Sequence, residues 1–160
     1  MSDLSKSELP VTKSLILERD ESVLKIWLNR PESKNALSTE MTDELNAVLD
    51  EVHDDRSIRT IVLRGKGGVF CAGGDIKGFK TDMQAVSADE VAKSNRSFGD
   101  LMIKLNEQPQ VVIILVEGAA IGGGLGLACV ADVTLVTADA RFRLSETSLG
   151  IPPAQIAPFV

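Results

Sequence analysis

Apolar and polar positions change their spacing along the chain, so that strand-like and helix-like segments follow one another. Strand-like runs occupy residues 14–19, 24–29, 60–64, 111–116 and 133–137, with a short extended piece at 142–144. Helical spacing of about 3.6 residues occupies 38–53, 88–107 and a stretch that ends near residue 131. This alternation predicts an α/β domain.

The segment ends carry recognisable turn and capping residues. Polar residues 20–22 predict a hairpin between the first two strands, Ser38 or Thr39 is expected to cap the first helix, and Pro109 to end the second. Residues 81–89 are largely polar and predict a loop over a binding cleft. The helices are expected to bury one apolar face each: Met41, Leu45, Val48, Leu49 and Val52 in the first, and Val91, Phe98, Leu101, Met102 and Leu105 in the second.

Composition narrows the classes of protein to consider. The chain has 160 residues, 44% hydrophobic and 25% charged, which predicts one domain spanning residues 1–160. A net charge of −6 argues against a nucleic-acid partner. The polar N-terminus lacks an apolar signal region, and the longest apolar run, 111–116, has only strand length, so no membrane span is expected.

The cysteine and histidine content favours a protein of the reducing cytoplasm without a metal site. Cys71 and Cys129 are too few for a disulfide scaffold and lie in segments that predict burial. His53 stands alone, late in the first helix, where a solvated surface position is expected.

Two glycine-rich turns carry the candidate chemistry. Phe70–Asp75 reads FCAGGD, Gly118–Ala128 reads GAAIGGGLGLA, and Glu146 follows within about twenty residues. Glycines before a helix present bare backbone N–H groups, which bind a developing negative charge. An enolate formed from a thioester needs two donors on one oxygen, and two such turns can supply them.

The second turn also resembles other glycine-rich sites. A dinucleotide site is disfavoured because the glycine run lies late in the chain and Thr137, not an acidic residue, closes the next strand. A P-loop is excluded by the lack of Gly-Lys-Ser/Thr. Small residues that let a helix pack closely on the sheet remain a purely structural alternative.

Four motifs in order identify a family resemblance. The chain resembles the crotonase, or enoyl-CoA hydratase/isomerase, superfamily along almost all of its length. The matching segments are LNRPESKNALS (Leu28–Ser38), FCAGGDI (Phe70–Ile76), VEGAAIGGGLGLACVADV (Val116–Val133) and FRLSETSLGIPP (Phe142–Pro153). The resemblance implies a ββα-superhelix fold, an acyl-CoA thioester substrate, an oxyanion hole formed by the N–H groups of Gly74 and Gly123, and Glu146 as the catalytic acid/base.

The same resemblance implies further binding residues and an assembly. Substrate-binding positions are Lys34, Ala36, Ala72, Asp75 and Ile76, with Lys34 and Ala36 near the nucleotide end of coenzyme A. Coenzyme A is part of the substrate, so no separate cofactor is expected. Family members act in fatty-acid and related acyl-CoA metabolism and form homotrimers or hexamers. Relatives carry a C-terminal helical region beyond the length of this chain, so a truncated core domain is expected.

Gly126 is the most informative departure from the family. Two-carboxylate hydratases carry a first Glu at this position, so here the chemistry is left to Glu146. One carboxylate can take a proton from water and return it on the same face, or it can move a proton from C2 to C4, as isomerase relatives do. Restoring a carboxylate by Gly126→Glu is expected to raise hydration of crotonyl-CoA. An acyl-CoA-binding chain without catalysis is the third possibility.

Finer resemblance favours hydration. The segments GGGLGLACVADV, SETSLG and PPAQIAPFV are similar to bacterial hydratases of methyl- or isohexenyl-branched glutaconyl thioesters. Such substrates carry a distal carboxylate. Arg141 and Arg143 share a strand face and either can pair with it or with Glu146, although plain surface positions are favoured. Glu117, where relatives often have Asn, is the outside candidate for a second catalytic acid.

Overall fold

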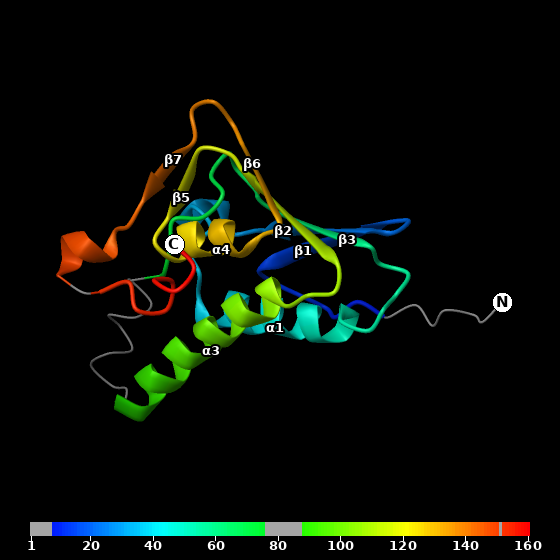
Figure 1. Ribbon diagram of the computed structural model, residues 1–160, viewed down its shortest axis with the longest axis horizontal. Coiled ribbons are helices and arrows are strands. Elements are labelled where there is room, and N and C mark those ends of the chain that lie inside the picture. Colours follow the sequence, from blue (N-terminus) through cyan, green and yellow to red (C-terminus); the bar gives the residue numbers. More distant parts are fainter. Residues whose placement is uncertain (1–7, 76–87, 151) are drawn as a thin grey trace.

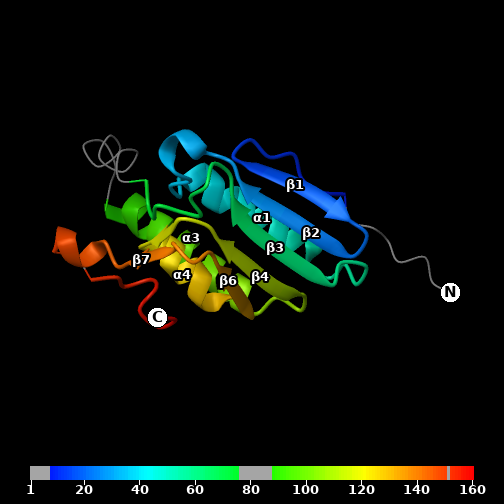
Figure 2. The ribbon, with the colours of Figure 1, turned by 90° about the horizontal axis from the view of Figure 1, so that it is seen from above.

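The main sheet has five strands and carries the rest of the molecule. In the computed structural model, residues 8–75, 88–150 and 152–160 are described. The strand order is β1-β2-β3-β4-β6, and Figure 2 shows the strands side by side in this order. Only the β1–β2 hairpin is antiparallel; β2, β3, β4 and β6 run parallel. The bounds are β1 (Leu15–Asp20), β2 (Val23–Leu28), β3 (Thr60–Gly65), β4 (Val111–Val116) and β6 (Val133–Val136).

A small second sheet begins where the chain leaves the main sheet after β4. It pairs β5 (Ala119–Ile121) with β7 (Arg141–Arg143) in parallel. Single bridges extend this layer, joining Cys71 to Ala120 and Leu37 to Gly74. The second sheet therefore gathers the segments that follow β3 and β4, far apart in sequence, into one layer (Figure 1).

Helices cover one face of the main sheet (Figures 1 and 2). Helix α1 packs on α3, and α3 packs on α4. Ser38 caps α1, accepting a hydrogen bond from the N–H of Met41 at 3.2 Å, as the sequence predicts. The bounds are α1 (Thr39–Val52), α3 (Ala88–Asn106), α4 (Gly123–Val130) and the single-turn 3₁₀ helices η1 (Pro31–Ser33) and η2 (Glu146–Leu149).

The core lies between the helices and the inner face of the sheet. Alternate residues of β2, β3 and β4 point inward and are buried, because side chains alternate across a strand. All five predicted apolar positions of α1 are buried, as are Leu101, Met102 and Leu105 of α3, while Phe98 is half-buried. The side chain of Val91 lies outside the described residues. The predicted strands and helices are thus confirmed, with ends shifted by a residue or two.

Some expectations need correction or fall outside the described residues. Cys129 is exposed on α4 rather than buried, whereas Cys71 is buried as predicted. His53 is exposed at the end of α1, as expected. Of the expected loop 81–89, residues 81–87 are not described and the last two begin α3. Within the described ranges, no helix combines the length and apolar character needed to span a membrane.

Candidate active site

The first glycine turn is held by backbone hydrogen bonds on both sides. The N–H of Leu37 donates to Gly73 O at 2.8 Å, and the N–H of Asp75 donates to Leu37 O at 3.0 Å. On the other side, the N–H of Cys71 donates to Ala119 O at 3.0 Å, and the N–H of Ile121 donates to Cys71 O at 2.9 Å. The turn is therefore clamped between the segment before α1 and the second sheet.

The two glycine turns touch each other. Gly73 has a φ of +90°, and a Cβ at this position would lie 2.8 Å from Ile121 O and 3.6 Å from the amide nitrogen of Gly123. A Cβ on Gly124 would lie 2.7 Å from Cys71 Cβ. Glycine is needed here because any side chain would push the turns apart. The contact of Gly73 with Ile121 and Gly123 brings the two turns, with the predicted donors Gly74 and Gly123, into one region.

Two amide groups in this region have no acceptor among the described residues. One is the N–H of Gly74, although the next amide, that of Asp75, donates to Leu37 O. Gly123 is the first residue of α4, where N–H groups lack intrahelical acceptors. Its N–H also has no hydrogen-bond partner in the described part of the chain. Unpaired donors at a helix N-terminus favour a negatively charged oxygen.

Glu146 lies against the glycine run. It opens η2, three residues after Arg143, whose carbonyl accepts the N–H of Gly122 at 2.8 Å. A Cβ on Gly122, whose φ is +50°, would lie 2.8 Å from Glu146 Oε1. Glu146 Oε2 is buried and, within the described ranges, has no hydrogen-bond partner. A buried carboxylate oxygen with free lone pairs beside free N–H donors is suited to accept a proton from a bound molecule.

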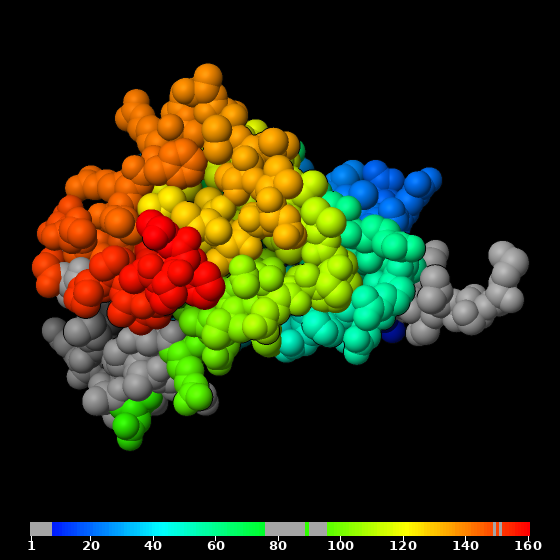
Figure 3. Space-filling model, viewed as in Figure 1, coloured from blue at the N-terminus to red at the C-terminus, as the bar shows by residue number. Residues whose placement is uncertain are grey.

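Position 126 is filled by neighbouring side chains. A Cβ on Gly126 would overlap Ile156 Cγ2 and lie 3.1 Å from Met102 Cε. Ile156 is 2% exposed. Figure 3 shows the C-terminal residues (red) against the surface formed by the α3 and α4 region. Gly126→Glu therefore has to displace Ile156 before any carboxylate can act, which removes the basis for expecting a simple gain in hydration from this one substitution.

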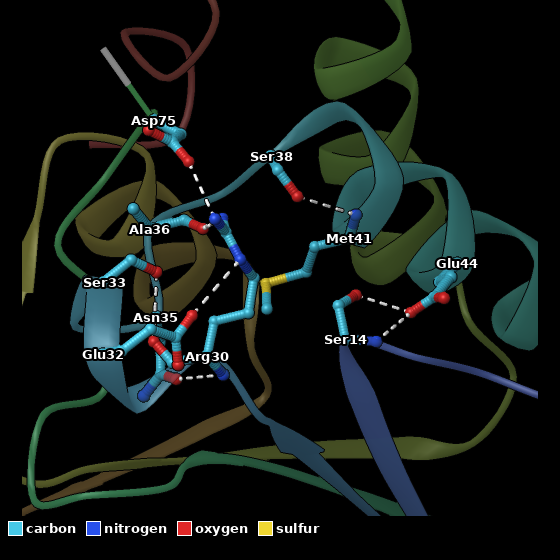
Figure 4. Close-up of polar contacts among 10 residues, drawn as sticks. All are labelled: Ser14, Arg30, Glu32, Ser33, Asn35, Ala36, Ser38, Met41, Glu44 and Asp75. Carbon is cyan, nitrogen blue, oxygen red and sulfur yellow. Dashed lines mark hydrogen bonds and ion pairs between the residues drawn. The ribbon is translucent and has the colours of Figure 1, made fainter. Parts of the chain in front are cut away.

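The predicted coenzyme A segment is braced by Arg30 and Asn35 (Figure 4). Arg30 donates to Ala36 O at 2.8 Å and to Asp75 at 3.0 Å. Asn35, fully buried, receives the N–H of Arg30 on its Oδ1 and donates to Val69 O at 2.7 Å. The Asp75 carboxylate thus ties the first glycine turn to the Arg30–Asn35 loop.

The other predicted binding positions lie around this brace. Lys34 is exposed with a left-handed φ of 53°, and its carbonyl accepts the N–H of half-buried Ala72 at 3.0 Å. Ala36 is 9% exposed. Ile76 lies outside the described residues. Lys34, Ala36, Ala72 and Asp75 therefore belong to one local unit next to the first turn.

Glu117 is engaged elsewhere and does not act as a second acid in this arrangement. Its carboxylate pairs with Arg64 at 2.7 Å. Arg141 and Arg143 are exposed on β7, and Arg143 donates to the hydroxyl of Ser148 at 2.9 Å. In the described part of the chain neither arginine forms an ion pair with Glu146. Their favoured interpretation as surface residues is confirmed.

Cys71 lies inside the first glycine turn, and its thiol is buried. Burial raises the pKa of the Cys71 thiol to about 12, only partly offset by a hydrogen bond from Gly73 N–H. The thiol therefore stays protonated near neutral pH and packs as an apolar group against Gly124. The described residues contain no group of three His, Cys, Asp or Glu side chains placed to hold a metal ion.

Sequence reasoning missed the residues that act through other residues. Arg30 lies in the Leu28–Ser38 motif, where the sequence assigns it no role; the one local signal is a charged loop residue next to a proline. Asn35 could have been suspected because a buried amide needs several partners. No local signal pointed to Ile156, since an apolar residue near the end of the chain predicts nothing about position 126.

Comparison with known proteins adds the family context. Residues 18–160 match the family described as enoyl-CoA hydratase/isomerase. The structure of Pseudomonas aeruginosa AtuE is 56% identical with a TM-score of 0.89, covering 92% of this chain and 57% of that one. An enoyl-CoA hydratase/isomerase from Marinobacter aquaeolei is 47% identical with a TM-score of 0.87, covering 91% and 57%.

A curated human relative gives the same picture at lower identity. The mitochondrial enoyl-CoA hydratase domain-containing protein 2 is 34% identical over 135 residues, covering 84% of this chain and 45% of that one. The chain spans about half the length of the curated relatives it matches. The predicted crotonase-like fold class is confirmed, since solved structures named as enoyl-CoA hydratases superimpose on nearly the whole chain.

Proposed function

The chain belongs to the enoyl-CoA hydratase/isomerase family, and on this premise we propose that it binds an acyl-CoA thioester and adds water across its α,β double bond. One observation carries the proposal. Among the described residues, Glu146 Oε2 is buried without a partner, Oε1 lies against Gly122, and the N–H of the next residue, Gly123, has no acceptor. A base and an oxyanion donor thus stand side by side.

In the proposed mechanism the thioester oxygen lies between the N–H groups of Gly74 and Gly123. Water attacks C3 while the Glu146 carboxylate removes one of its protons, and the π electrons move to the thioester oxygen as an enolate. Each backbone donor typically lowers such a barrier by about 3 kcal/mol. Protonated Glu146 then returns the proton to C2 on the same face, which restores the carboxylate and the thioester.

The loop before α1 is the proposed coenzyme A contact. Lys34 is exposed and its backbone bonds to Ala72, one residue before Gly73. A nucleotide phosphate beside Lys34 would therefore be held on the same unit as the oxyanion turn. By family resemblance the assembly we propose is a homotrimer or hexamer, and the compartment a reducing cytoplasm.

For the acyl group we propose a branched glutaconyl-type chain. The support is the sequence resemblance of the three segments around Glu146 to hydratases of this type. Arg141 and Arg143 present exposed guanidinium groups on the strand leading to Glu146, and guanidinium pairs well with a carboxylate. Arg143 is the less available of the two because it already donates to Ser148.

One observation favours a second candidate, Δ3–Δ2 isomerisation. The position of the usual first carboxylate is a glycine packed against Ile156 and Met102. Asp75 and Glu117 are paired with arginines, which leaves Glu146 as the carboxylate at the turns without an ion pair among the described residues. A single carboxylate that removes a C2 proton and delivers it to C4 needs no water.

Turnover assays separate the candidates. The purified chain is incubated with crotonyl-CoA, a 3-enoyl-CoA and 3-methylglutaconyl-CoA, and the absorbance of the conjugated thioester is followed. Hydration removes this absorbance from the 2-enoyl substrates, whereas isomerisation creates it from the 3-enoyl substrate. Binding of all three without turnover would reject both reactions and leave an acyl-CoA-binding chain.

Replacing Glu146 by Gln tests the mechanism directly. The amide cannot take a proton, so kcat is expected to fall at least about 100-fold with thioester binding retained. Glu40→Gln is the matched control, since Glu40 is an exposed residue of α1 that pairs with Lys13. Activity of Glu146→Gln within a few-fold of the parent would rule out Glu146 as the acid/base.

A further inference from the structure

Four side chains form a cluster on the outer face of the main sheet, opposite the helices. The guanidinium carbon of Arg64 lies 4.1 Å from the centroid of the Trp27 ring, and Lys66 Nζ lies 4.0 Å from it. Arg64 Nη2 donates to Glu117 Oε2 at 2.7 Å. We name Trp27, Arg64, Lys66 and Glu117 the Arg64 clasp. It joins three neighbouring parallel strands, β2, β3 and β4, at the ends from which the glycine turns leave.

The Arg64 clasp lies where β3 and β4 separate. Arg64 is the last residue of β3 with a paired partner on β4, Leu115. Gly65 follows and leads to the first glycine turn, whereas Glu117 follows β4 and leads to the second. The ion pair therefore connects the two chain segments just before each one enters its turn.

The backbone of Glu117 makes the first link between the turns. Its carbonyl accepts the N–H of Phe70 at 2.8 Å and the N–H of Ala119 at 2.9 Å. Gly118, with a φ of +69°, is packed so closely on Gly68 that a Cβ would overlap the Gly68 carbonyl oxygen. A shift of Glu117 is therefore transmitted to both turns, since neither neighbour has room to absorb it.

The Arg64 clasp is held more firmly than an ordinary surface ion pair. The Arg64 and Glu117 side chains are 30% and 36% exposed, and the Arg64 guanidinium also packs on an aromatic face, which adds a cation–π attraction. Arg64 Nε and Trp27 Nε1 are buried without hydrogen-bond partners among the described residues. Among the described residues, Glu117 is the carboxylate that pairs with Arg64, so its loss takes that counter-ion from a half-buried guanidinium.

From these contacts we infer that Arg64 and Glu117 are positioning residues, which set the separation of the Gly74 and Gly123 N–H groups by fixing the start of both glycine turns. The inference deepens the proposed function and rests on it, because it assigns these N–H groups to an enolate oxygen. Neither side chain touches the reacting atoms. Displacing an N–H donor by a fraction of an ångström weakens its hydrogen bond to an enolate oxygen far more than its hydrogen bond to a neutral carbonyl oxygen.

Kinetics of Glu117 variants test the positioning role. Glu117→Ala is expected to lower kcat about tenfold and to change KM less than about threefold. Glu117→Gln keeps a side-chain oxygen that can accept a hydrogen bond from Arg64, so its kcat is expected to stay close to that of the parent. Asp20→Ala is the control, because the Asp20–Lys25 pair, 2.9 Å long on the same sheet, lies far along β1 from the turns. Unchanged kcat in Glu117→Ala, or an equal loss in Asp20→Ala, would overturn the inference.

A binding measurement separates this inference from the proposed reaction. Acetoacetyl-CoA bound as its enolate absorbs in the near ultraviolet and needs both N–H donors but no turnover. Glu117→Ala is expected to bind it about tenfold more weakly than the parent and to bind coenzyme A equally well. Equal binding of acetoacetyl-CoA by parent and variant would overturn the positioning role. Failure of the parent to form the enolate would overturn the proposed function and the inference together, whereas a parent that forms it without hydrating any enoyl-CoA would fail the proposed reaction alone.

Discussion

At the scale of single residues, the same residue type has different roles because its surroundings differ. Gly126 and Gly99 both lie inside helices. An added Cβ at Gly126 would meet Ile156 and Met102, whereas at Gly99 it would meet no atom within 4 Å. Gly126 is therefore required because the C-terminal residues pack closely on α4. Gly99 has no such packing role and only lowers the helix propensity of α3.

This difference predicts opposite effects on stability. Gly126→Ala is expected to lower the free energy of unfolding by about 1–3 kcal/mol, because Ile156 must move. Gly99→Ala is expected to raise it by about 0.5–1 kcal/mol. Urea denaturation measures both. In an Ile156→Ala background the cost of Gly126→Ala should shrink, and an unchanged cost there would show that Ile156 is not the obstacle.

At the scale of elements, one carboxylate ties the start of β1 to α1. Glu44 accepts hydrogen bonds from the backbone N–H of Lys13 at 2.7 Å. It also accepts from the Ser14 N–H at 3.0 Å and from the Ser14 hydroxyl, as Figure 4 shows. Burial alone would raise the pKa of Glu44, but these hydrogen bonds and the charge of Lys13 together lower it. The pair of elements is thus held best when Glu44 is ionised.

The lowered pKa predicts a pH-dependent contribution to stability. Since the folded state binds the proton more weakly than the unfolded state, the contribution is present above the ordinary pKa of 4.5 and is lost as pH falls through the folded value. Glu44→Gln is expected to cost about 1 kcal/mol at pH 7 and progressively less below pH 4.5. Urea midpoints across this range measure it. Glu40→Gln is the control, and a cost for Glu44→Gln that stays constant with pH would contradict the assignment.

At the scale of the whole molecule, the two cysteine thiols differ in how much of the fold must open before they can react. Cys129 is exposed on α4, whereas Cys71 is fully buried between the glycine turns and its thiol is protonated at neutral pH. Reaction of Cys71 therefore requires the layers of the fold to separate, which removes the candidate site at the same time.

Thiol labelling is expected to show two phases. In native buffer, one thiol per chain reacts quickly with an aromatic disulfide reagent, and the second reacts at the rate of unfolding. Cys129→Ser removes the fast phase and leaves the slow one, which serves as the assignment control. If acyl-CoA thioesters bind the turns, a ligand at about 100 times its Kd stabilises the fold by about 2.7 kcal/mol and slows the second phase accordingly. Two fast phases in the parent would contradict the burial of Cys71.

Local rules determined much of this protein from its sequence. The alternation of apolar residues predicted five strands of the main sheet and the buried face of α1, because periodicity depends on residues within a few positions of each other. Ser38 was recognisable as a cap for the same reason. The glycine turns and the family motifs placed Gly74, Gly123 and Glu146 as candidates before their proximity was known.

Only the tertiary structure decided which of these residues meet. The contact of Glu146 with Gly122, the pairing of Glu117 with Arg64 and the filling of position 126 by Ile156 each join residues more than twenty positions apart. Such contacts depend on how the sheets and helices pack, and the residue types involved suit several different partners. Glu117 illustrates the difference: its sequence position suggested a second acid, while its packing makes it one half of an ion pair that holds both glycine turns.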